Sequence, residues 1–269
     1  MMGMWNIEFT GKKPNLKNPV FIEGLPGIGN VGKLAADFLI EEIKAKKIAE
    51  FTSFSFPHSV FINEDNLVEL PVIEVYCKKF NNRKKDLLIL AGDVQPIDEK
   101  SCYEFSSKVL DIASEFGCSE IVTLGGIAMK SEPKSPSVFC TGNNKELITA
   151  YKKSIKNLNN ELYGVVGPII GVSGVLLGLA GRKNMKAVSL LAETYGHPMY
   201  LGVKGTREIL KVLNKKFNLK LNFKSIDKEM EAINGEFSQQ KQQLSPADLQ
   251  KNKAIKKLRK SCNDVNYIG

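Results

Sequence analysis

Short, continuous apolar runs that alternate with helical patterns constrain the fold of this 269-residue chain most strongly. Three such runs occupy residues 86–91, 121–124 and 187–192, and each is followed by glycine or an acidic residue. Runs of this length are typical of strands buried on both faces of a parallel sheet. Helical patterns alternate with the strands, at residues 31–44, 98–116, 145–157 and 206–217. The alternation predicts an α/β fold, a three-layer sandwich around a mostly parallel sheet.

A glycine-rich segment joins the apolar run at residues 20–22 to the first helical pattern. It contains Gly24, Pro26, Gly27, Gly29 and Gly32, and the last three have the spacing of the dinucleotide-binding fingerprint. A dinucleotide site also needs an acidic residue about 20 positions further on, at the carboxyl end of the second strand. The next strand-like run ends without one, and Glu50 lies at the entry of that strand. We therefore expect a structural turn with no cofactor, and a nicotinamide-dependent dehydrogenase is the third of three functional hypotheses.

The positive charge of the chain is concentrated near its end. The formal net charge is +9, yet residues 1–202 hold 23 Lys and Arg against 22 Asp and Glu, whereas residues 203–260 hold 15 against 6. A basic segment can contact nucleic acid or an acidic protein surface. No aromatic residues are interleaved with the lysines in the way that single-strand binders use them. We expect no nucleic-acid partner.

Cysteine and histidine usage argues against a metal site. Five scattered cysteines and two histidines show neither zinc-ligand spacing nor a disulfide framework. No apolar run approaches the 18 residues of a membrane span, and the first residues lack the features of a signal peptide. The expectation is a cytoplasmic protein with no metal and no membrane partner.

Beyond Asn222 the composition changes, which predicts a second unit. Ser225 can cap a helix that Asn234 and Gly235 close, and a polar stretch follows. Ser245 and the residues after it can start a basic helix that has only a thin apolar seam. We place an α/β domain at residues 1–224 and a basic, helical C-terminal extension at residues 225–269.

Five short motifs occur in a characteristic order along the chain. Gly24-Leu25-Pro26-Gly27-Ile28-Gly29-Asn30-Val31-Gly32 follows the first strand, Phe56-Pro57 the second, and Gly125-Gly126 the buried strand at 121–124. Gly171-Val172-Ser173-Gly174-Val175-Leu176-Leu177 and Leu190-Leu191-Ala192-Glu193-Thr194 come later. In this order the chain resembles the proteasome assembly chaperone family, in its archaeal form, over about residues 18–217.

The resemblance implies a fold and a function. The fold would be a three-layer α/β sandwich similar to that of nucleoside phosphorylases. The function would be to bind proteasome α subunits or core particle as a homo-oligomer and to assist proteasome assembly, without catalysis. A paralogous chaperone is a further candidate partner that the sequence leaves open. The glycine loop would then need no nucleotide.

The end of the chain departs from the pattern of family members that dock on the assembled core particle. Such members resemble proteasome activators in ending with a hydrophobic residue, a tyrosine and one last residue. Here Tyr267 is third from last and Asn266 precedes it, with Val265, Ile268 and Gly269 as the other candidate tail contacts. A terminal carboxylate would lie about 3.3 Å farther out. Whether the tail docks stays open.

An enzymatic alternative rests on four side chains. Asp93 and Glu193 each follow a buried strand, His58 follows another strand, and His197 lies four residues after Glu193. Such positions carry catalytic groups in α/β enzymes, which keeps open a hydrolase or phosphorylase acting on a small nucleoside-like or phosphorylated ligand. A nucleophile elbow is missing from the sequence. We expect capping and turn roles for these residues, unless they meet in one deep pocket.

Overall fold

The computed structural model describes residues 5–63, 65–80, 85–156, 158–159, 161–162, 167–198 and 200–232. Its main sheet has nine strands in the order β1-β3-β6-β7-β2-β8-β11-β9-β10. The strand bounds are β1 Asn6–Phe9, β2 Val20–Gly24, β3 Lys46–Thr52, β6 Ile73–Lys78, β7 Leu87–Gly92, β8 Glu120–Met129, β9 Val138–Gly142, β10 Leu158–Asn159 and β11 Ala187–Tyr195. A separate two-stranded sheet pairs β4 (Phe61–Ile62) with β5 (Val68–Glu69).

Parallel pairing holds in the centre of the sheet. β7, β2, β8 and β11 are parallel neighbours, whereas β6 pairs antiparallel with β7 and β9 pairs antiparallel with β11. The short edge strand β10 pairs parallel with β9. Beyond β6, β3 is antiparallel again, so it runs in the same direction as β7. The carboxyl ends of β3, β7, β2, β8 and β11 therefore meet at one edge of the sheet, which we call the carboxyl edge.

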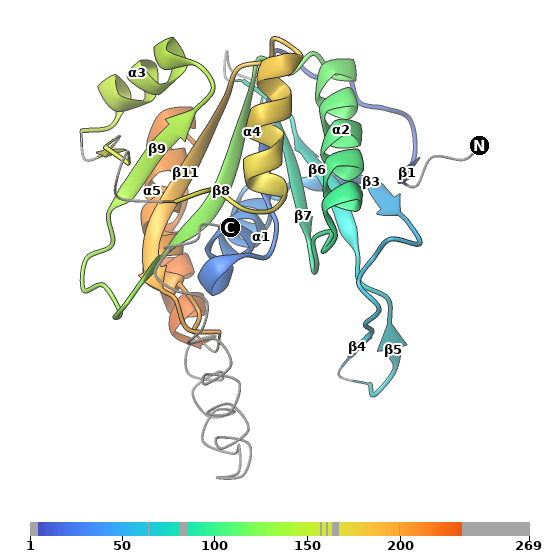
Figure 1. The fold of residues 1–269 in the computed structure, drawn as a ribbon, viewed down its shortest axis with the longest axis horizontal. Coiled ribbons are helices and arrows are strands. Elements are labelled where there is room, and N and C mark those ends of the chain that lie inside the picture. Colours follow the sequence, from blue (N-terminus) through green and yellow to red (C-terminus); the bar gives the residue numbers. More distant parts are fainter. Residues whose placement is uncertain are drawn as a thin grey trace.

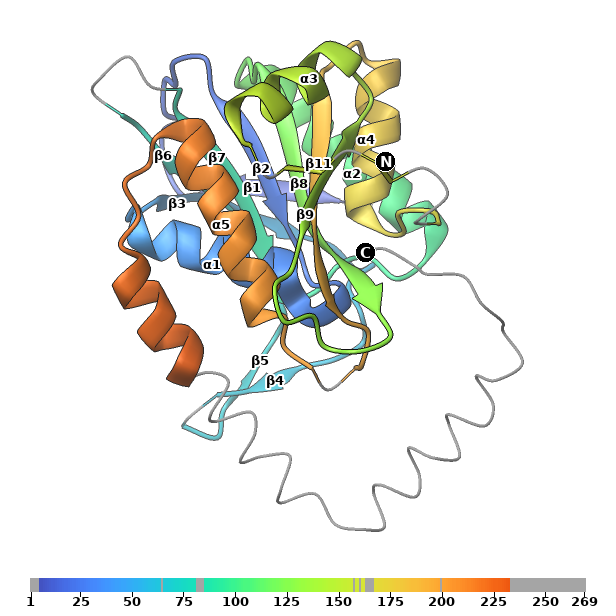
Figure 2. The same ribbon diagram turned by 90° about the vertical axis from the view of Figure 1, so that its left-hand side faces the viewer.

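Helices cover both faces of the sheet (Figures 1 and 2). The helix bounds are α1 Val31–Glu42, α2 Glu99–Glu115, α3 Lys145–Ser154, α4 Val172–Arg182 and α5 Val203–Phe217, with a short 3-10 helix at Ile28–Asn30. α1 and α5 pack on one face and α2 and α4 on the other. The expected three-layer α/β sandwich is confirmed.

Side chains of the central strands divide between the two helical layers. On β2, Val20 and Ile22 join the core under α1 and α5, while Phe21 joins the core under α2 and α4. Both cores are apolar, so neither face of these strands carries polar side chains. Their sequences are therefore continuous apolar runs and do not alternate between apolar and polar residues. Asp98 caps α2 by accepting a hydrogen bond from the Ser101 backbone N–H at 2.8 Å.

Several elements were not predicted from the sequence. β1, β9 and β10 were missed, and so was α4, which contains three glycines within the stretch 172–182. Glycine lowers helix propensity by about 1 kcal/mol per residue, so packing on α2 and the sheet must stabilise α4. β8 is longer than the predicted strand because it continues through Gly125 and Gly126 to Met129.

The described part of the C-terminal extension packs on the α/β body. Residues 223–232 are helical, and Ile226 and Met230 are buried in the core cluster of α1 and α5. Residues 233–269, with the expected basic helix and the tail, lie outside the described residues. Within the described ranges, no helix is both long and apolar enough to cross a membrane.

Candidate functional site

The glycine loop is a tight turn between β2 and α1 at the carboxyl edge. Gly29 has φ 63° inside the short 3-10 helix, and Asn30, which precedes α1, has φ 50°. Both angles lie in the left-handed region, which glycine and asparagine adopt most readily. The Gly29 carbonyl accepts a hydrogen bond from the Gly202 backbone N–H at 2.7 Å, so the loop is tied to the start of α5.

Close backbone contacts leave no room for side chains in the loop. A Cβ at Gly24 would lie 2.4 Å from the Gly32 carbonyl oxygen, and a Cβ at Gly32 would lie 2.3 Å from that of Leu124. A Cβ at Gly126 on β8 would lie 2.4 Å from the Ile28 carbonyl oxygen. The glycines therefore allow the backbones of β2, α1 and β8 to pack directly against one another, without side chains between them.

Gln95 holds the glycine loop to the start of α4. Its side-chain amide donates to the Pro26 carbonyl at 2.7 Å and accepts from the Val172 N–H at 3.1 Å. Behind this bridge Glu23 is fully buried, and its carboxylate accepts from Ser173 Oγ at 2.9 Å and from the Leu25 N–H at 3.1 Å. Burial raises the pKa of Glu23 to about 7, and the two hydrogen bonds oppose that rise.

A pocket of about 440 Å³ lies over the loop. Its described lining includes Gly27, Gly29, Gln95, Gly171 and His197. His197 stacks on Tyr195 with ring centroids 5.6 Å apart. The described residues of the lining include no carboxylate.

The four candidate catalytic side chains do not converge. Asp93 accepts from the Val72 N–H at 3.2 Å and lies 3.5 Å from Lys33 Nζ, while Glu193 accepts from the Ser137 N–H at 2.8 Å. Two strands separate β7 from β11, which puts the ends that carry these acids about 14 Å apart. His58 is exposed in the loop after β3, and only His197 lines the glycine-loop pocket.

The sheet order also disagrees with a dinucleotide site. In such a site the strand that follows the first helix lies beside the first strand and carries the ribose-binding acid. Here β3 follows α1, but β7 and β6 separate it from β2. Glu50 on β3 bonds Lys47 instead, with Oε2 2.7 Å from Nζ.

Exposed apolar side chains gather at the carboxyl edge. The β4–β5 hairpin projects from the body of the molecule (Figure 1). The large apolar side chains that are exposed, among the described residues, are Phe54, Val60, Phe61, Ile62, Leu67, Val68, Leu70, Ile97, Tyr103, Met129 and Ile170. Phe54 and the hairpin residues follow β3, Ile97 follows β7, Met129 ends β8 and Ile170 precedes α4, all at this edge, and Tyr103 lies one turn into α2, the helix that starts there. We call this set the apolar edge.

The hairpin is the densest part of the apolar edge. Ile62 and Val68 are directly opposed across it and are 71% and 69% exposed. Exposed apolar groups concentrated in one region typically mark an interaction surface. Sequence reasoning missed this surface, because an apolar run looks the same whether its strand is buried or projects into solvent. The signal that could have indicated it is the apolar run Val60-Phe61-Ile62.

The cysteines and the C-terminal tail complete the set of residues that the sequence singled out. Cys77, Cys102, Cys118 and Cys140 are free thiols, and no cluster of metal-ligating side chains occurs within the described residues. Val265, Tyr267, Ile268 and Gly269 lie outside those residues, as does Cys262.

Three comparisons with known proteins agree with this architecture. The model of the PAC2 family matches residues 21–241. Uncharacterized protein MJ0106 of Methanocaldococcus jannaschii is 32% identical over 231 residues, which cover 85% of this chain and 88% of that protein. The crystal structure of Pyrococcus furiosus PbaB, an archaeal proteasome activator, matches with a TM-score of 0.80 and 33% identity, covering 89% of this chain and 100% of that one. Pyrococcus furiosus PbaA, an archaeal homolog of proteasome-assembly chaperone, shares the fold at a TM-score of 0.71 and 22% identity, with 97% and 99% coverage.

Proposed function

The chain belongs to the PAC2 family, and we propose that it is a non-catalytic, chaperone-like protein that binds proteasome α subunits or the assembled core particle. The likeness to PbaB supports this proposal, because it extends over nearly the whole of both chains at 33% identity. The separation of Asp93 from Glu193 favours binding over hydrolysis. A cytoplasmic location belongs to the same proposal.

The observation that carries the proposal is the apolar edge. A protein that recognises another protein needs apolar side chains that remain accessible in the free state. The hairpin offers Phe61, Ile62 and Val68 on a two-stranded sheet that is separate from the main sheet (Figure 2). An isolated hairpin is marginally stable in water, so a partner surface would also order it.

We assign the hairpin first to contact between copies of this chain. A homo-oligomer brings several equal surfaces to a ring of α subunits, and each added contact increases the avidity. The rest of the apolar edge, including Ile97 and Ile170, would remain for the α subunits or for a paralogous chaperone. Val265, Tyr267, Ile268 and Gly269 form a second proposed contact, in which the tail enters pockets between α subunits.

Native mass spectrometry and capture on immobilised α subunits of the same organism test the proposal together. The informative variant is Ile62→Lys combined with Val68→Glu. It removes two apolar side chains, and the new opposite charges face each other across the hairpin and preserve its pairing. We expect a defined wild-type oligomer that captures α subunits, and a variant that is largely monomeric and captures at least about tenfold less.

The matched control is Ala150→Glu with Ser154→Lys on the exposed face of α3. It also adds one negative and one positive charge, four residues apart on one helix face and away from the hairpin. The control should behave like the wild type. A chain that lacks residues 262–269 tests the tail separately: loss of capture with an intact oligomer would assign docking to the tail. A wild-type oligomer that ignores both α subunits and core particle would refute the function.

A further inference from the structure

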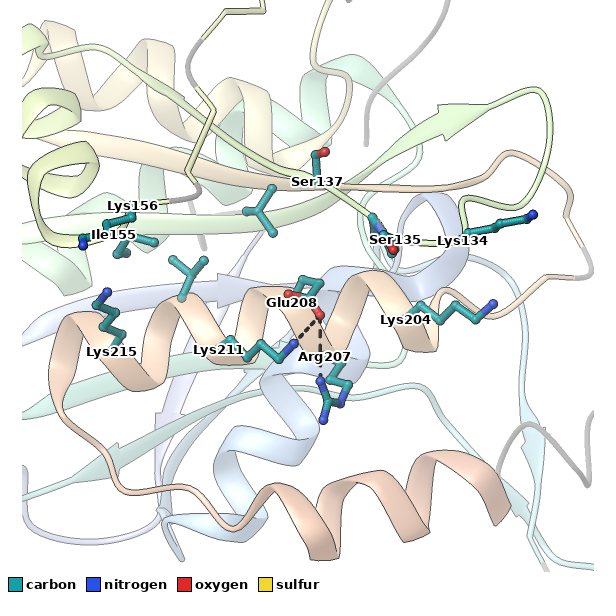
Figure 3. A pocket seen from close by; sticks show the side chains of 13 residues that line it. Lys134, Ser135, Ser137, Ile155, Lys156, Lys204, Arg207, Glu208, Lys211 and Lys215 are labelled. Atoms are coloured by element: carbon teal, nitrogen blue, oxygen red, sulfur yellow. Dashed lines mark hydrogen bonds and ion pairs between the residues drawn. The ribbon is translucent and has the colours of Figure 1, made fainter.

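A basic groove runs along α5 on the face of the sheet opposite α2 and α4. Its volume is about 810 Å³, and α5, the segment before β9 and the residues after α3 line it. The cationic side chains of the lining are Lys134, Lys156, Lys204, Arg207, Lys211 and Lys215. Figure 3 shows Lys156 and Lys215 at one end of this groove and Lys134 and Lys204 at the other. Glu208 is the one acidic side chain among the described lining residues.

Half of these cations already bind carboxylates. Lys204 pairs with Glu132 at 2.7 Å, Arg207 makes two hydrogen bonds to Asp227, and Lys211 pairs with Glu208 at 2.6 Å. Lys134, Lys156 and Lys215 make no salt bridge within the described part of the chain. Among the described residues, three cations of the groove therefore lack a carboxylate partner, and they lie at both of its ends.

The length of the groove indicates an extended ligand. The stripe from Lys204 to Lys215 spans eleven helical steps, or about 16 Å. A single phosphate cannot reach both ends of such a stripe. About five residues of extended polypeptide can, at about 3.3 Å per residue.

The chemistry of the lining favours polypeptide over nucleic acid. Val138, Ile155 and Val212 form an apolar floor between the cations, which suits aliphatic side chains. Proteins that bind single-stranded nucleic acid present aromatic rings on which bases stack. The described lining of the groove contains no aromatic residue.

We propose that this groove binds an extended, acidic segment of a partner protein, with carboxylates at its ends and an aliphatic side chain near its middle. The C-terminal extension of this chain is a poor occupant, because residues 233–269 hold seven Lys and Arg against three Asp and Glu. The inference goes beyond the proposed function. The groove runs along α5 on one face of the sheet, away from the hairpin, and the inference does not depend on binding to α subunits.

Fluorescence anisotropy with a labelled synthetic peptide tests the groove directly. The probe is a peptide of about ten residues, rich in Asp and Glu and carrying two leucines, added to the full-length protein at low and physiological salt. The variant Lys156→Gln with Lys215→Gln removes two of the three cations that lack a described carboxylate partner, so it breaks no described salt bridge. We expect the peptide to bind the wild type and the variant to bind it about tenfold more weakly, with affinity falling as salt rises.

The control variant Lys12→Gln with Lys100→Gln loses the same net charge from exposed positions outside the groove, and its affinity should change by less than about twofold. A peptide with Asn and Gln in place of the acids should not bind, and pyrophosphate should not compete at equal concentration. Equal weakening in the two variants would overturn the proposal, since it would reflect net charge alone. Tighter binding of an oligothymidylate of the same charge would also overturn the proposal, because it would identify nucleic acid as the ligand of the groove.

Discussion

At the scale of single residues, the glycine loop shows how backbone packing restricts the sequence. Gly32 faces the Leu124 carbonyl, and neither partner can move without displacing β8 or α1. We predict that Gly32→Ala lowers the free energy of unfolding by about 1–3 kcal/mol, measured by urea denaturation. Gly178→Ala is the control, because a Cβ at that exposed position in α4 meets no atom within 4 Å. The control should stabilise by about 0.5–1 kcal/mol, and equal losses in both variants would refute the packing argument.

Glu23 gives a residue-scale prediction on pH. Its carboxyl titrates near the ordinary value of 4.5 in the unfolded chain and, because of burial, near about 7 in the folded protein. Between these values the folded state keeps a proton that the unfolded state has lost, so the free energy of unfolding falls as pH rises through this window. The loss is on the order of 3 kcal/mol.

The variant Glu23→Gln isolates that effect. Its amide stays neutral at every pH, so its stability relative to the wild type should increase between pH 4.5 and pH 7.5 by most of that amount. Urea unfolding of both proteins across this range measures the difference. Parallel pH profiles would show that Glu23 does not carry a raised pKa in the folded protein.

At the scale of elements, the helix at residues 223–232 is held by two kinds of contact. Ile226 is fully buried against the core, whereas the Arg207–Asp227 ion pair is more than one-third exposed. We predict that Ile226→Ala costs about 2–4 kcal/mol of unfolding free energy. Asp227→Asn should cost about 0.5–1 kcal/mol, because solvent screens an exposed pair. Denaturation of the two variants tests the ranking, and a larger loss in Asp227→Asn would contradict it.

Sequence patterns predicted those elements whose local signals agree with their packing. The strand at Leu87–Gly92 is apolar throughout because it is buried on both faces, and α2 has both a capping aspartate and an apolar stripe. α4 was missed because its glycines weaken the helical signal and its support comes from α2, which is distant in sequence. The short strands β9 and β10 depend on pairing with β11 and with each other, which no local pattern reports.

The candidate site was predicted less completely than the fold. The turn at Gly29 was expected from its spacing, because positive φ is a local property of the chain. The apolar edge was not, because Ile97 and Ile170 lie at the same edge of the sheet as the hairpin only once the carboxyl ends of the strands are aligned. Nor was the basic groove, since Lys134 and Lys156 meet α5 only in the folded protein.

Over the whole molecule, two different surfaces lie on one α/β sandwich. The apolar edge is suited to burying side chains against a protein, and the basic groove is suited to a flexible acidic segment. The two surfaces predict opposite responses to salt: binding through the apolar edge should change little with ionic strength, whereas binding in the groove should weaken.

Hydrogen–deuterium exchange of the full-length protein, alone and with proteasome α subunits of its own organism, tests whether the apolar edge is the contact surface. We predict slower amide exchange at residues 54–70 when the chain oligomerises, and slower exchange around Ile97 and Ile170 when α subunits are added, with α3 unchanged. Binding of α subunits that protects α3 or the groove but leaves the whole carboxyl edge unprotected would contradict this account.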